Sequence, residues 1–424
     1  MKVLVVGHGG REHALAWRLS QSPGAEVLIT KGNGGTDDSA KALPVGPNEI
    51  DALVETAVDR EVGLVVVGPE TPLAMGLADR LQARGIPVFG PVQAAARIES
   101  SKSFAKTLML EAGVPTARHE VFDDPNAALR HLLQCPLPVV VKADGLAAGK
   151  GVVVAQTRDE AVEAVKSFMV DGALGHAGRK VVVEEFLQGD EASLMVITDG
   201  ERILPLPGAR DHKRVFDGDE GPNTGGMGAY SPTALLEGDA LEDILRRVIR
   251  PVLEEMGRRG IVYQGVLYAG LIITPEGPKV LEFNCRFGDP ETQPLMMRLK
   301  GNLLEALHAC TQGRLGDVRL DFLAQPAITV VLATAGYPDR PRSGDVIEGI
   351  DEAAAVLGVR LFHAGTRRLP DGTLVTAGGR VLGVTALGDS FREARGRAYE
   401  AAQKVRFAGR HFRTDIGARH KGPF

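Results

Sequence analysis

The chain has 424 residues, 44% of them hydrophobic and 24% charged, and its net charge is −5. This length predicts several domains with buried cores, and the mildly negative charge gives no reason to expect nucleic acid or an anionic membrane as a partner. The sequence contains no run of about 18 apolar residues, so no membrane span is predicted. The three cysteines are too few and too scattered for a disulfide framework or a zinc site, so a reducing compartment, the cytoplasm, is expected.

The first hundred residues alternate between strand and helix. Short apolar strands are predicted at 3–6, 27–29, 64–67 and 88–89, and helices at 11–20, 50–58 and 73–84. Short apolar strands between amphipathic helices predict a parallel sheet covered on both faces. Ligands of such sheets bind beyond the carboxyl ends of the strands, and here those ends carry glycine-containing turns at 7–10, 31–36 and 68–70.

The rest of the chain has a different pattern. A helix is predicted at 100–112, and a small α/β lid is predicted from strands at 137–142, 152–155 and 181–185 and a helix at 159–170. Strands at 193–198, 266–274 and 279–284 predict a larger antiparallel sheet. A final α/β region is predicted from strands at 327–333 and 380–384 and a helix at 390–405.

The strand predicted at 279–284 carries two candidate metal ligands. Its side chains alternate between faces, so Glu282 and Asn284 should point the same way while Leu281 and Phe283 point into a core. Two oxygen ligands on a strand suit Mg²⁺ that is also held by substrate phosphates and water. The alternative for these two residues, an acidic strand end before a solvated turn, remains open.

The turn after the first strand resembles a dinucleotide fingerprint with a substitution. In Gly-His-Gly-Gly-Arg-Glu at 7–12, Glu12 holds the place of the third glycine, and no acidic residue follows the second strand to bind a ribose. Backbone N–H groups at a helix N-terminus could bind a phosphate. A tight turn without a ligand is the alternative, and NAD binding is less favoured than either.

Residues 142–151, Lys-Ala-Asp-Gly-Leu-Ala-Ala-Gly-Lys-Gly, form a second glycine-rich segment. Lys142 closes an apolar strand and needs an anion, because an unpaired buried ammonium is costly. The spacing is not that of a Walker A loop, since Gly151 stands where Ser or Thr would bind magnesium. A mobile loop over phosphates between two antiparallel strands is predicted, with an exposed glycine hairpin as the alternative.

Three further polar segments lie between the predicted strands. Residues 184–191 connect two strands and could offer backbone groups and a carboxylate to a nucleoside. Residues 211–214, Asp-His-Lys-Arg, are dense in charge, and residues 221–230 are too rich in glycine for a helix or an interior strand. Together the last two predict loops around an anionic ligand; surface loops and surface charge are the alternatives.

Residues 286–293, Arg-Phe-Gly-Asp-Pro-Glu-Thr-Gln, resemble the signature of the phosphoribosylamine–glycine ligase (glycinamide ribonucleotide synthetase) family of ATP-grasp enzymes. The segments at 9–14, 68–70, 142–151, 211–214 and 223–230 stand in the same order as in that family. One departure is Lys31, where relatives commonly have proline.

The resemblance implies an α/β and α+β multidomain fold: a Rossmann-like, parallel-sheet N-terminal domain, an ATP-grasp central domain with a small α/β lid, and a C-terminal α/β domain. The expected boundaries are 1–101 for the first, 102–120 with 188–326 for the central domain, 121–187 for the lid and 327–424 for the last. The functional unit is expected to be a monomer.

The resemblance also implies the reaction. ATP, glycine and 5-phosphoribosylamine would give glycinamide ribonucleotide, ADP and phosphate through glycyl phosphate, in purine biosynthesis. ATP enters as a substrate, and the metal would be Mg²⁺ or Mn²⁺, which oxygen ligands alone do not distinguish. No nucleic acid or membrane partner is implied.

Site residues are carried over from the resemblance by role. The expected catalytic residues are Arg286, Lys142 and Asp211. Nucleotide binding is expected from Lys102, Lys142, Gly145, Gly149, Lys150, Gly151, Glu184, Glu185, Phe186, Leu187 and Glu191. The other substrates are expected to contact Gly9, Gly10, Asp211, His212, Lys213, Asn223 and Arg286, and the metal is expected on Glu282 and Asn284.

Three other interpretations compete with this one. A nicotinamide dehydrogenase would use the N-terminal turn, but Glu12 and the missing ribose acid disfavour it. A non-catalytic protein with a decayed site is disfavoured by the intact lysines and acids. A ligase or carboxylase for another purine intermediate is disfavoured by residues 286–293.

Overall fold

The structure is a computed structural model that describes residues 1–147, 149–418 and 420. The predicted phosphate-covering loop 145–151 and the predicted C-terminal domain 327–424 therefore each contain residues that lie outside the described ranges. Among the described residues, no helix is both long enough and apolar enough to cross a membrane.

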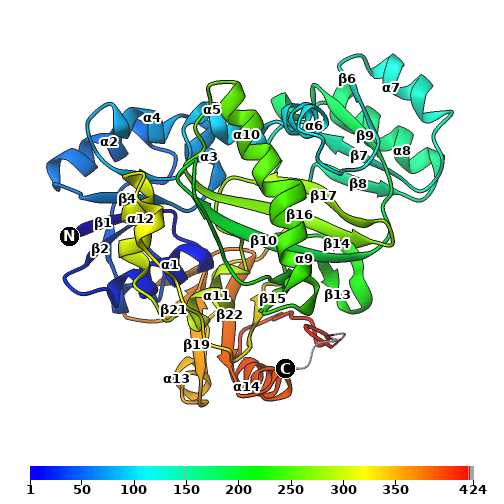
Figure 1. Cartoon of the computed structure of the whole chain (residues 1–424). Helices are drawn as coiled ribbons and strands as arrows, with labels where there is room; N and C mark the ends of the chain where they lie inside the picture. The colour runs from blue at the N-terminus through cyan, green and yellow to red at the C-terminus, as the bar shows by residue number, and fades with distance from the viewer. Residues whose placement is uncertain (148, 419, 421–424) are drawn as a thin grey trace.

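The N-terminal region is built on a parallel sheet of five strands in the order β3-β2-β1-β4-β5, drawn in blue in Figure 1. Its two central strands consist almost entirely of Val and Leu, and their side chains are buried on both faces, as expected for a sheet covered by helices. The elements are β1 (Lys2–Val6), α1 (Gly10–Ser20), β2 (Glu26–Thr30), β3 (Lys41–Leu43), α2 (Ile50–Asp59), β4 (Leu64–Val67), α3 (Glu70–Ala74), α4 (Leu77–Gln82), β5 (Val88–Phe89) and α5 (Gln93–Ser100). The predicted parallel sheet is confirmed.

Two predicted helices have different bounds in the structure. The single helix predicted at 73–84 is wrong: Gly76 adopts a left-handed conformation with φ of 82° and separates α3 from α4. The helix predicted at 100–112 begins only at Lys102 as α6 (Lys102–Glu111). Ser101 is extended, and its side chain caps α6 by accepting a hydrogen bond from the backbone N–H of Phe104.

The lid is a four-stranded antiparallel sheet in the order β6-β9-β7-β8, at the upper right of Figure 1. Helices α7 and α8 pack against its apolar face. The elements are β6 (His119–Phe122), α7 (Pro125–Leu132), β7 (Val139–Ala143), β8 (Val152–Ala155), α8 (Arg158–Val165) and β9 (Val181–Glu185). The helix predicted to reach residue 170 does so, but its α-helical part ends at Val165 and the segment Lys166–Val170 is a π-helical turn. As predicted, the glycine-rich segment joins two antiparallel strands, β7 and β8.

The central sheet is antiparallel, in the order β11-β10-β16-β17, and α10 crosses one of its faces (Figure 1). Alternate side chains of β10 and β16 enter two different cores, one with α10 and the other with α12 and strand β1. The elements are β10 (Asp190–Thr198), β11 (Ile203–Pro205), α9 (Asp239–Ile244), α10 (Arg250–Arg258), β16 (Gly265–Thr274), β17 (Gly277–Asn284), α11 (Thr292–Arg298) and α12 (Leu303–Thr311).

A β-bulge changes the alternation of β17. Gly270 of β16 lies opposite Glu282 while the next residue, Leu271, lies opposite Val280, so Leu281 is the extra residue. The prediction that Leu281 points into a core is therefore wrong; its side chain is half-buried and lines a cavity. From Glu282 onward the pairing is regular, and Phe283 is buried in the core as predicted.

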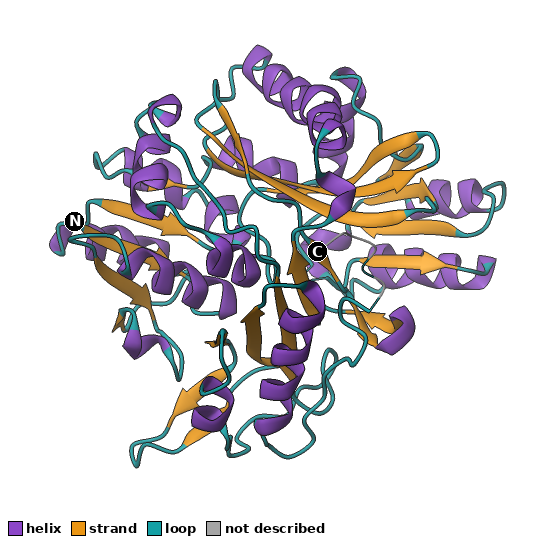
Figure 2. Cartoon of the chain, turned by 60° about the horizontal axis from the view of Figure 1, so that its bottom comes forward, coloured by secondary structure: helices purple, strands orange, loops and turns teal. Residues whose placement is uncertain are grey.

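The C-terminal region contains a five-stranded antiparallel sheet, β12-β15-β18-β22-β19, against which α14 packs. Figure 2 turns this region toward the viewer. Two of its strands, β12 and β15, come from the segment predicted as the central domain, and the predicted domain boundaries stay a prediction. The elements are β12 (Arg210–Asp211), β13 (Arg214–Phe216), β14 (Glu220–Asn223), β15 (Gly228–Ser231), β18 (Ala327–Ala333), α13 (Ile350–Ala354), β19 (Val359–His363), β20 (Thr366–Arg368), β21 (Leu374–Thr376), β22 (Arg380–Leu387) and α14 (Phe391–Lys404).

Candidate active site

A cavity of about 940 Å³ lies where the four regions of the chain meet. Glu70 reaches it from the N-terminal sheet, Lys142 from the lid, Glu282 from the central sheet and Arg380 from the C-terminal sheet. Glu70 begins α3 after a short turn that follows β4, so the carboxyl end of a parallel strand does face the cavity, which is where ligands of such sheets bind.

Most of the predicted site residues line this cavity. They are Lys102, Lys142, Gly149, Gly151, Glu184, Glu185, Phe186, Leu187, Glu191, Asp211, His212, Lys213, Asn223, Glu282, Asn284 and Arg286. In the described part of the chain, the wall does not include Gly9, Gly10, Gly145 or Lys150. Gly145 packs against Ala177, and Lys150 is exposed.

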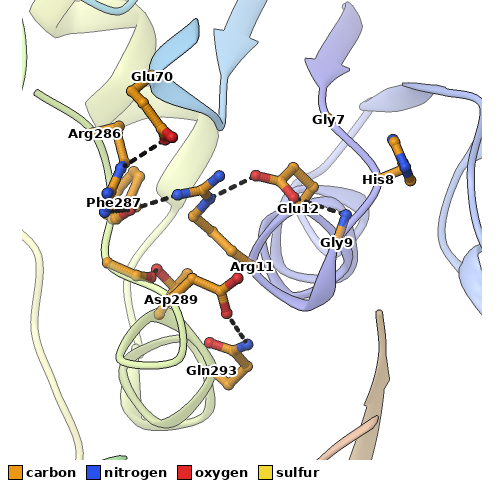
Figure 3. Close-up of polar contacts among 12 residues, drawn as sticks. Gly7, His8, Gly9, Arg11, Glu12, Glu70, Arg286, Phe287, Asp289 and Gln293 are labelled. Carbon is orange, nitrogen blue, oxygen red and sulfur yellow. Dashed lines mark hydrogen bonds and ion pairs between the residues drawn. The ribbon is translucent and has the colours of Figure 1, made fainter. Parts of the chain in front are cut away.

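The glycine turn before α1 already holds an anion, the side chain of Glu12 (Figure 3). Its Oε2 accepts a hydrogen bond of 2.8 Å from the Gly9 N–H, and its Oε1 pairs with Arg11 Nε at 2.5 Å. Glu12 is only 3% exposed. Glu12 therefore already caps the Gly9 N–H at this turn, while Arg11 reaches the cavity.

Glu12 also requires glycine at the end of β4. A Cβ added to Gly68 would lie 2.1 Å from Glu12 Oε1 and 2.6 Å from its Cγ. We expect Gly68→Ala to lower the free energy of unfolding by about 1–3 kcal/mol, because the held carboxylate cannot move without losing its partners. Urea unfolding measures this loss. Gly257→Ala in α10, where an added Cβ meets nothing within 4 Å, is the matched control; equal stabilities of both variants would contradict the tight packing.

One end of the cavity is rich in ammonium groups. Lys142 Nζ lies 2.9 Å from Glu184 Oε2 and donates a hydrogen bond of 3.1 Å to the Leu281 carbonyl. Lys102 Nζ donates to the Gly145 carbonyl at 3.3 Å. Burial lowers the pKa of Lys102, and Lys142 lowers it further, against the opposing effect of Glu282. Both ammonium groups line the cavity, so an anionic ligand bound there would neutralise their positive charge.

Glu282 is the acid that these cations surround. Its Oε1 is 3.5 Å from Lys213 Nζ. Burial raises the pKa of Glu282, but Lys213, Lys142 and Lys102 outweigh burial and lower it to about 2. Asn284, two residues along β17, is buried and directs its Oδ1 toward Arg286, whose NH2 donates to it at 3.2 Å. The pair offers an ionised carboxylate and an amide oxygen, the donor types that Mg²⁺ prefers.

Arg286 is held between two carboxylates, one of them shown in Figure 3. Its Nε donates to Glu70 at 3.3 Å and its NH2 to Glu99 at 2.8 Å. Burial lowers the pKa of Arg286, but Glu99 and Glu70 outweigh it and the net shift is upward. One N–H of its NH1 group donates a hydrogen bond to the Phe287 carbonyl. Four of the five guanidinium N–H groups thus have partners within the described residues, which leaves one N–H on NH1 for a ligand.

A second charged group surrounds Lys213. Its Nζ lies 3.6 Å from Glu191 and 3.5 Å from Glu282. Burial lowers the pKa of Lys213, but Asp211 and these two acids outweigh burial and raise it. The pKa of Asp211 is also raised: burial, Glu291 and Glu191 bring it to about 7 in spite of Lys213. Asp211 can therefore gain or lose a proton near neutral pH.

His212 and Asn223 lie on the C-terminal side of the cavity. Burial first, and Arg413 next, lower the pKa of His212 to about 4, so its imidazole is neutral at pH 7. Its Nε2 accepts a hydrogen bond of 3.4 Å from the Gly417 N–H. Asn223 ends β14 opposite Arg214. Neutral imidazole and amide groups add hydrogen-bonding capacity here without adding charge.

Sequence reasoning missed several residues of the cavity wall. Glu99 has no sequence signal, because it meets Arg286 from 187 residues away. Glu70 was noted only as part of a turn, although its position at the carboxyl end of a strand could have indicated it. Lys106 was also missed; it lies four residues after Lys102 on α6 and so on the same side of the helix. Arg380 is a further missed residue of the wall, and its guanidinium pairs with Asp289 at 2.7 Å.

Comparison with known families matches nearly the whole chain. Residues 1–99 match the phosphoribosylglycinamide synthetase N domain, residues 100–292 match the ATP-grasp (A) domain of the same synthetase, and residues 327–419 match its C domain.

Individual proteins give the same result. The chain is 47% identical to phosphoribosylamine–glycine ligase of Yersinia pestis over 99% of both chains, and 49% identical to that of Brucella melitensis over 99% of this chain and 98% of the relative. The crystal structure of the ligase of Thermotoga maritima superposes with a TM-score of 0.86 at 34% identity, covering 98% of this chain and 100% of the other. The biotin carboxylase of Campylobacter jejuni, with a TM-score of 0.74, 16% identity and coverage of 100% and 95%, shares the fold.

Proposed function

Because the chain belongs to the phosphoribosylglycinamide synthetase family, we propose that it joins glycine to 5-phosphoribosylamine at the expense of ATP, in purine biosynthesis. The products are glycinamide ribonucleotide, ADP and phosphate. The observation that carries this proposal is the similarity over 99% of the chain to ligases of this name. The cavity supports it, since it brings cations, an ionised acid and a lid together in one place.

The reaction proceeds in two steps in this proposal. A glycine carboxylate oxygen attacks the γ-phosphorus of ATP, and the bond to ADP breaks to give glycyl phosphate. The amine nitrogen of phosphoribosylamine then attacks the glycyl carbonyl carbon, phosphate leaves, and the nitrogen loses a proton. Asp211, with a pKa of about 7, is positioned in the cavity wall to accept that proton.

Lys102 and Lys142 hold the nucleotide phosphates in this assignment. The segment from Glu185 to Leu187 lines the adenine, and Glu191 binds the ribose; all of these residues line the cavity. The role first expected for Glu184 changes. Its side chain is paired with Lys142 and not free for the base, so we assign it to the phosphate end of the site.

A divalent cation fits beside Glu282 and Asn284. The ionised carboxylate and the amide oxygen are suitable ligands for the cation, which we propose to be Mg²⁺ or Mn²⁺. When bound, the cation supplies charge that neutralises the phosphates during transfer.

The remaining substrates are assigned to the opposite end. Arg286 offers one N–H to the glycine carboxylate, and Glu70, whose Oε2 contacts Arg286 and whose carboxylate lines the cavity, is suited to the glycine ammonium. Asp211 to Lys213 and Asn223 contact phosphoribosylamine. Gly9 and Gly10 are not assigned to its phosphate, since neither lines the cavity and the Gly9 N–H already binds Glu12.

Glycyl phosphate hydrolyses in water, so the loop after β7 must exclude solvent. Gly149 has φ of 80°, and an added Cβ would lie 3.5 Å from the Thr224 carbonyl oxygen. We expect Gly149→Val to lower turnover about 10-fold and to change ADP affinity less than about 3-fold, because the strained loop closes poorly. Steady-state kinetics and calorimetry measure the two effects.

Gly172→Val is the matched control for that loop variant. Gly172 also has a positive φ, of 68°, but lies in the lid with nothing within 4 Å of an added Cβ. It should keep near-normal turnover. Equal losses of turnover and ADP affinity in Gly149→Val would argue against a closing loop.

The proposed reaction is tested by ADP release with Mg²⁺-ATP and glycine, with and without phosphoribosylamine formed in situ from ribose 5-phosphate and ammonia. Release that needs both substrates supports the ligase. Release that is indifferent to glycine would reject the substrate assignment and leave the ATP-grasp fold standing.

We propose that the enzyme acts as a monomer in the cytoplasm. One chain supplies cavity-lining residues from all four of its regions, which supports a single-chain functional unit. Cys135, Cys285 and Cys310 are all free thiols, which supports a reducing compartment.

A further inference from the structure

Lys106 belongs to a buried chain of polar contacts behind the phosphate end of the cavity. Its Nζ donates to Thr116 Oγ1 at 2.7 Å and lies 3.1 Å from Glu184 Oε1. The other oxygen of Glu184, Oε2, pairs with Lys142 at 2.9 Å. All three charged side chains are at most 8% exposed. One carboxylate therefore bridges two buried ammonium groups, one from α6 and one from the lid.

The two lysines differ in what surrounds them. Lys106 is fixed by Thr116, which itself donates to the Val280 carbonyl at 2.7 Å, and by Glu184. Among the described residues, the partners of Lys142 are Glu184 and a carbonyl on β17. It is also one of the cations assigned to the nucleotide phosphates. When Lys142 turns to a phosphate, Glu184 would lose a partner. A buried carboxylate left without any cation costs several kcal/mol.

We propose that Lys106 is a positioning residue for the nucleotide: it keeps a second positive charge on Glu184, so that Lys142 can move to a nucleotide phosphate without leaving that carboxylate unpaired. This inference rests on the proposed function only in assigning Lys142 to a phosphate. It predicts a role in nucleotide binding for a lysine whose ammonium is directed at Glu184 and Thr116.

Titration of Lys106 provides a second route to the same inference. The charged groups facing it are Glu184 and Glu185 of β9 and Lys142 of β7. Burial, opposed by Glu184, lowers the pKa of Lys106 to about 8. Above this pH Lys106 is neutral and Glu184 has Lys142 alone, so nucleotide affinity should fall as the pH rises from 7 to 9.

The test uses Lys106→Met in the full-length chain, with Mg²⁺-ADP as the probe in calorimetry. In the free protein Glu184 keeps Lys142, so the midpoint of urea unfolding should change little. In the complex Glu184 is unpaired, so the ADP dissociation constant should rise at least 10-fold. Its increase with pH, present in the wild-type protein, should be absent.

Two further variants separate positioning from packing. Lys106→Arg keeps the charge and should restore most of the ADP affinity. Thr116→Val removes the neutral partner of Lys106 but no charge, and should change affinity less than about 3-fold. Wild-type affinity in Lys106→Met, or parallel losses of affinity and stability, would overturn the proposal. Because ADP binding is measured, the result does not depend on whether glycine is ligated.

Discussion

Glu282→Gln should lower glycine-dependent ADP release at least 100-fold while the protein stays folded. The substitution keeps the shape of the side chain and removes the only ionised oxygen of the pair assigned to the metal. Three ammonium groups, on Lys213, Lys142 and Lys102, lower the pKa of this acid to about 2, so it is ionised at every pH suitable for an assay. The loss is of the size expected when charge stabilisation at a phosphoryl group is removed.

The same variant should need more Mg²⁺ for half-maximal activity, which a titration of the metal measures. Glu276→Gln is the matched control: Glu276 lies at the turn of the same hairpin, with a side chain that is 70% exposed. It should leave turnover and metal dependence unchanged. If Glu282→Gln kept wild-type turnover at low Mg²⁺, the metal assignment on β17 would be wrong.

Arg286→Met should destabilise the protein by about 3–5 kcal/mol, because it leaves two carboxylates without their cation in a partly enclosed site. The side chains of Glu99 and Arg286 are 7% and 17% exposed, and burial already raises the pKa of Glu99. Without Arg286, Glu99 should bind a proton near neutral pH. The loss of stability should therefore grow as the pH rises from the ordinary carboxyl pKa of about 4 and be greatest where the buried Glu99 must ionise.

Arg286→Lys separates stability from catalysis. The ammonium keeps a positive charge near both acids but cannot form the fork of hydrogen bonds made by guanidinium. We expect turnover to fall about 100-fold with a much smaller loss of stability. Arg246→Met, an ion-paired arginine with a side chain that is 72% exposed, should cost less than about 1 kcal/mol. A fully active Arg286→Lys variant would contradict a role in orienting a substrate.

Local patterns in the sequence were sufficient to predict those parts of the site that lie within a single segment of the chain. The alternation of β17 brings Glu282 and Asn284 to the cavity wall, and the glycine loop does follow Lys142 between antiparallel strands. A single extra residue, Leu281, interrupts the alternation one position earlier. Such a bulge depends on the partner strand and leaves no periodicity to read.

Contacts between distant segments could not be read from the sequence. Arg286 meets Glu70 across 216 residues, and the role of Glu184 depends on Lys106 from a helix far earlier in the chain. Glu12 was recognised as a departure from a nucleotide fingerprint, but only the structure shows that its carboxylate accepts the Gly9 N–H. Helix ends were missed for a related reason: the backbone conformations of Gly76 and Ser101 divide runs whose composition is continuous.

The mixed origin of the C-terminal sheet has a consequence for the order of synthesis. Strand β15 (Gly228–Ser231) pairs on one side with the two-residue strand β12 and on the other with β18 (Ala327–Ala333). At ribosomal rates of about 5–20 residues per second, β18 emerges roughly 5–20 s after β15. During that interval the nascent chain carries a buried-type strand with one open edge. Until the last quarter of the sequence leaves the ribosome, a newly made chain therefore exposes this edge to pairing with another chain.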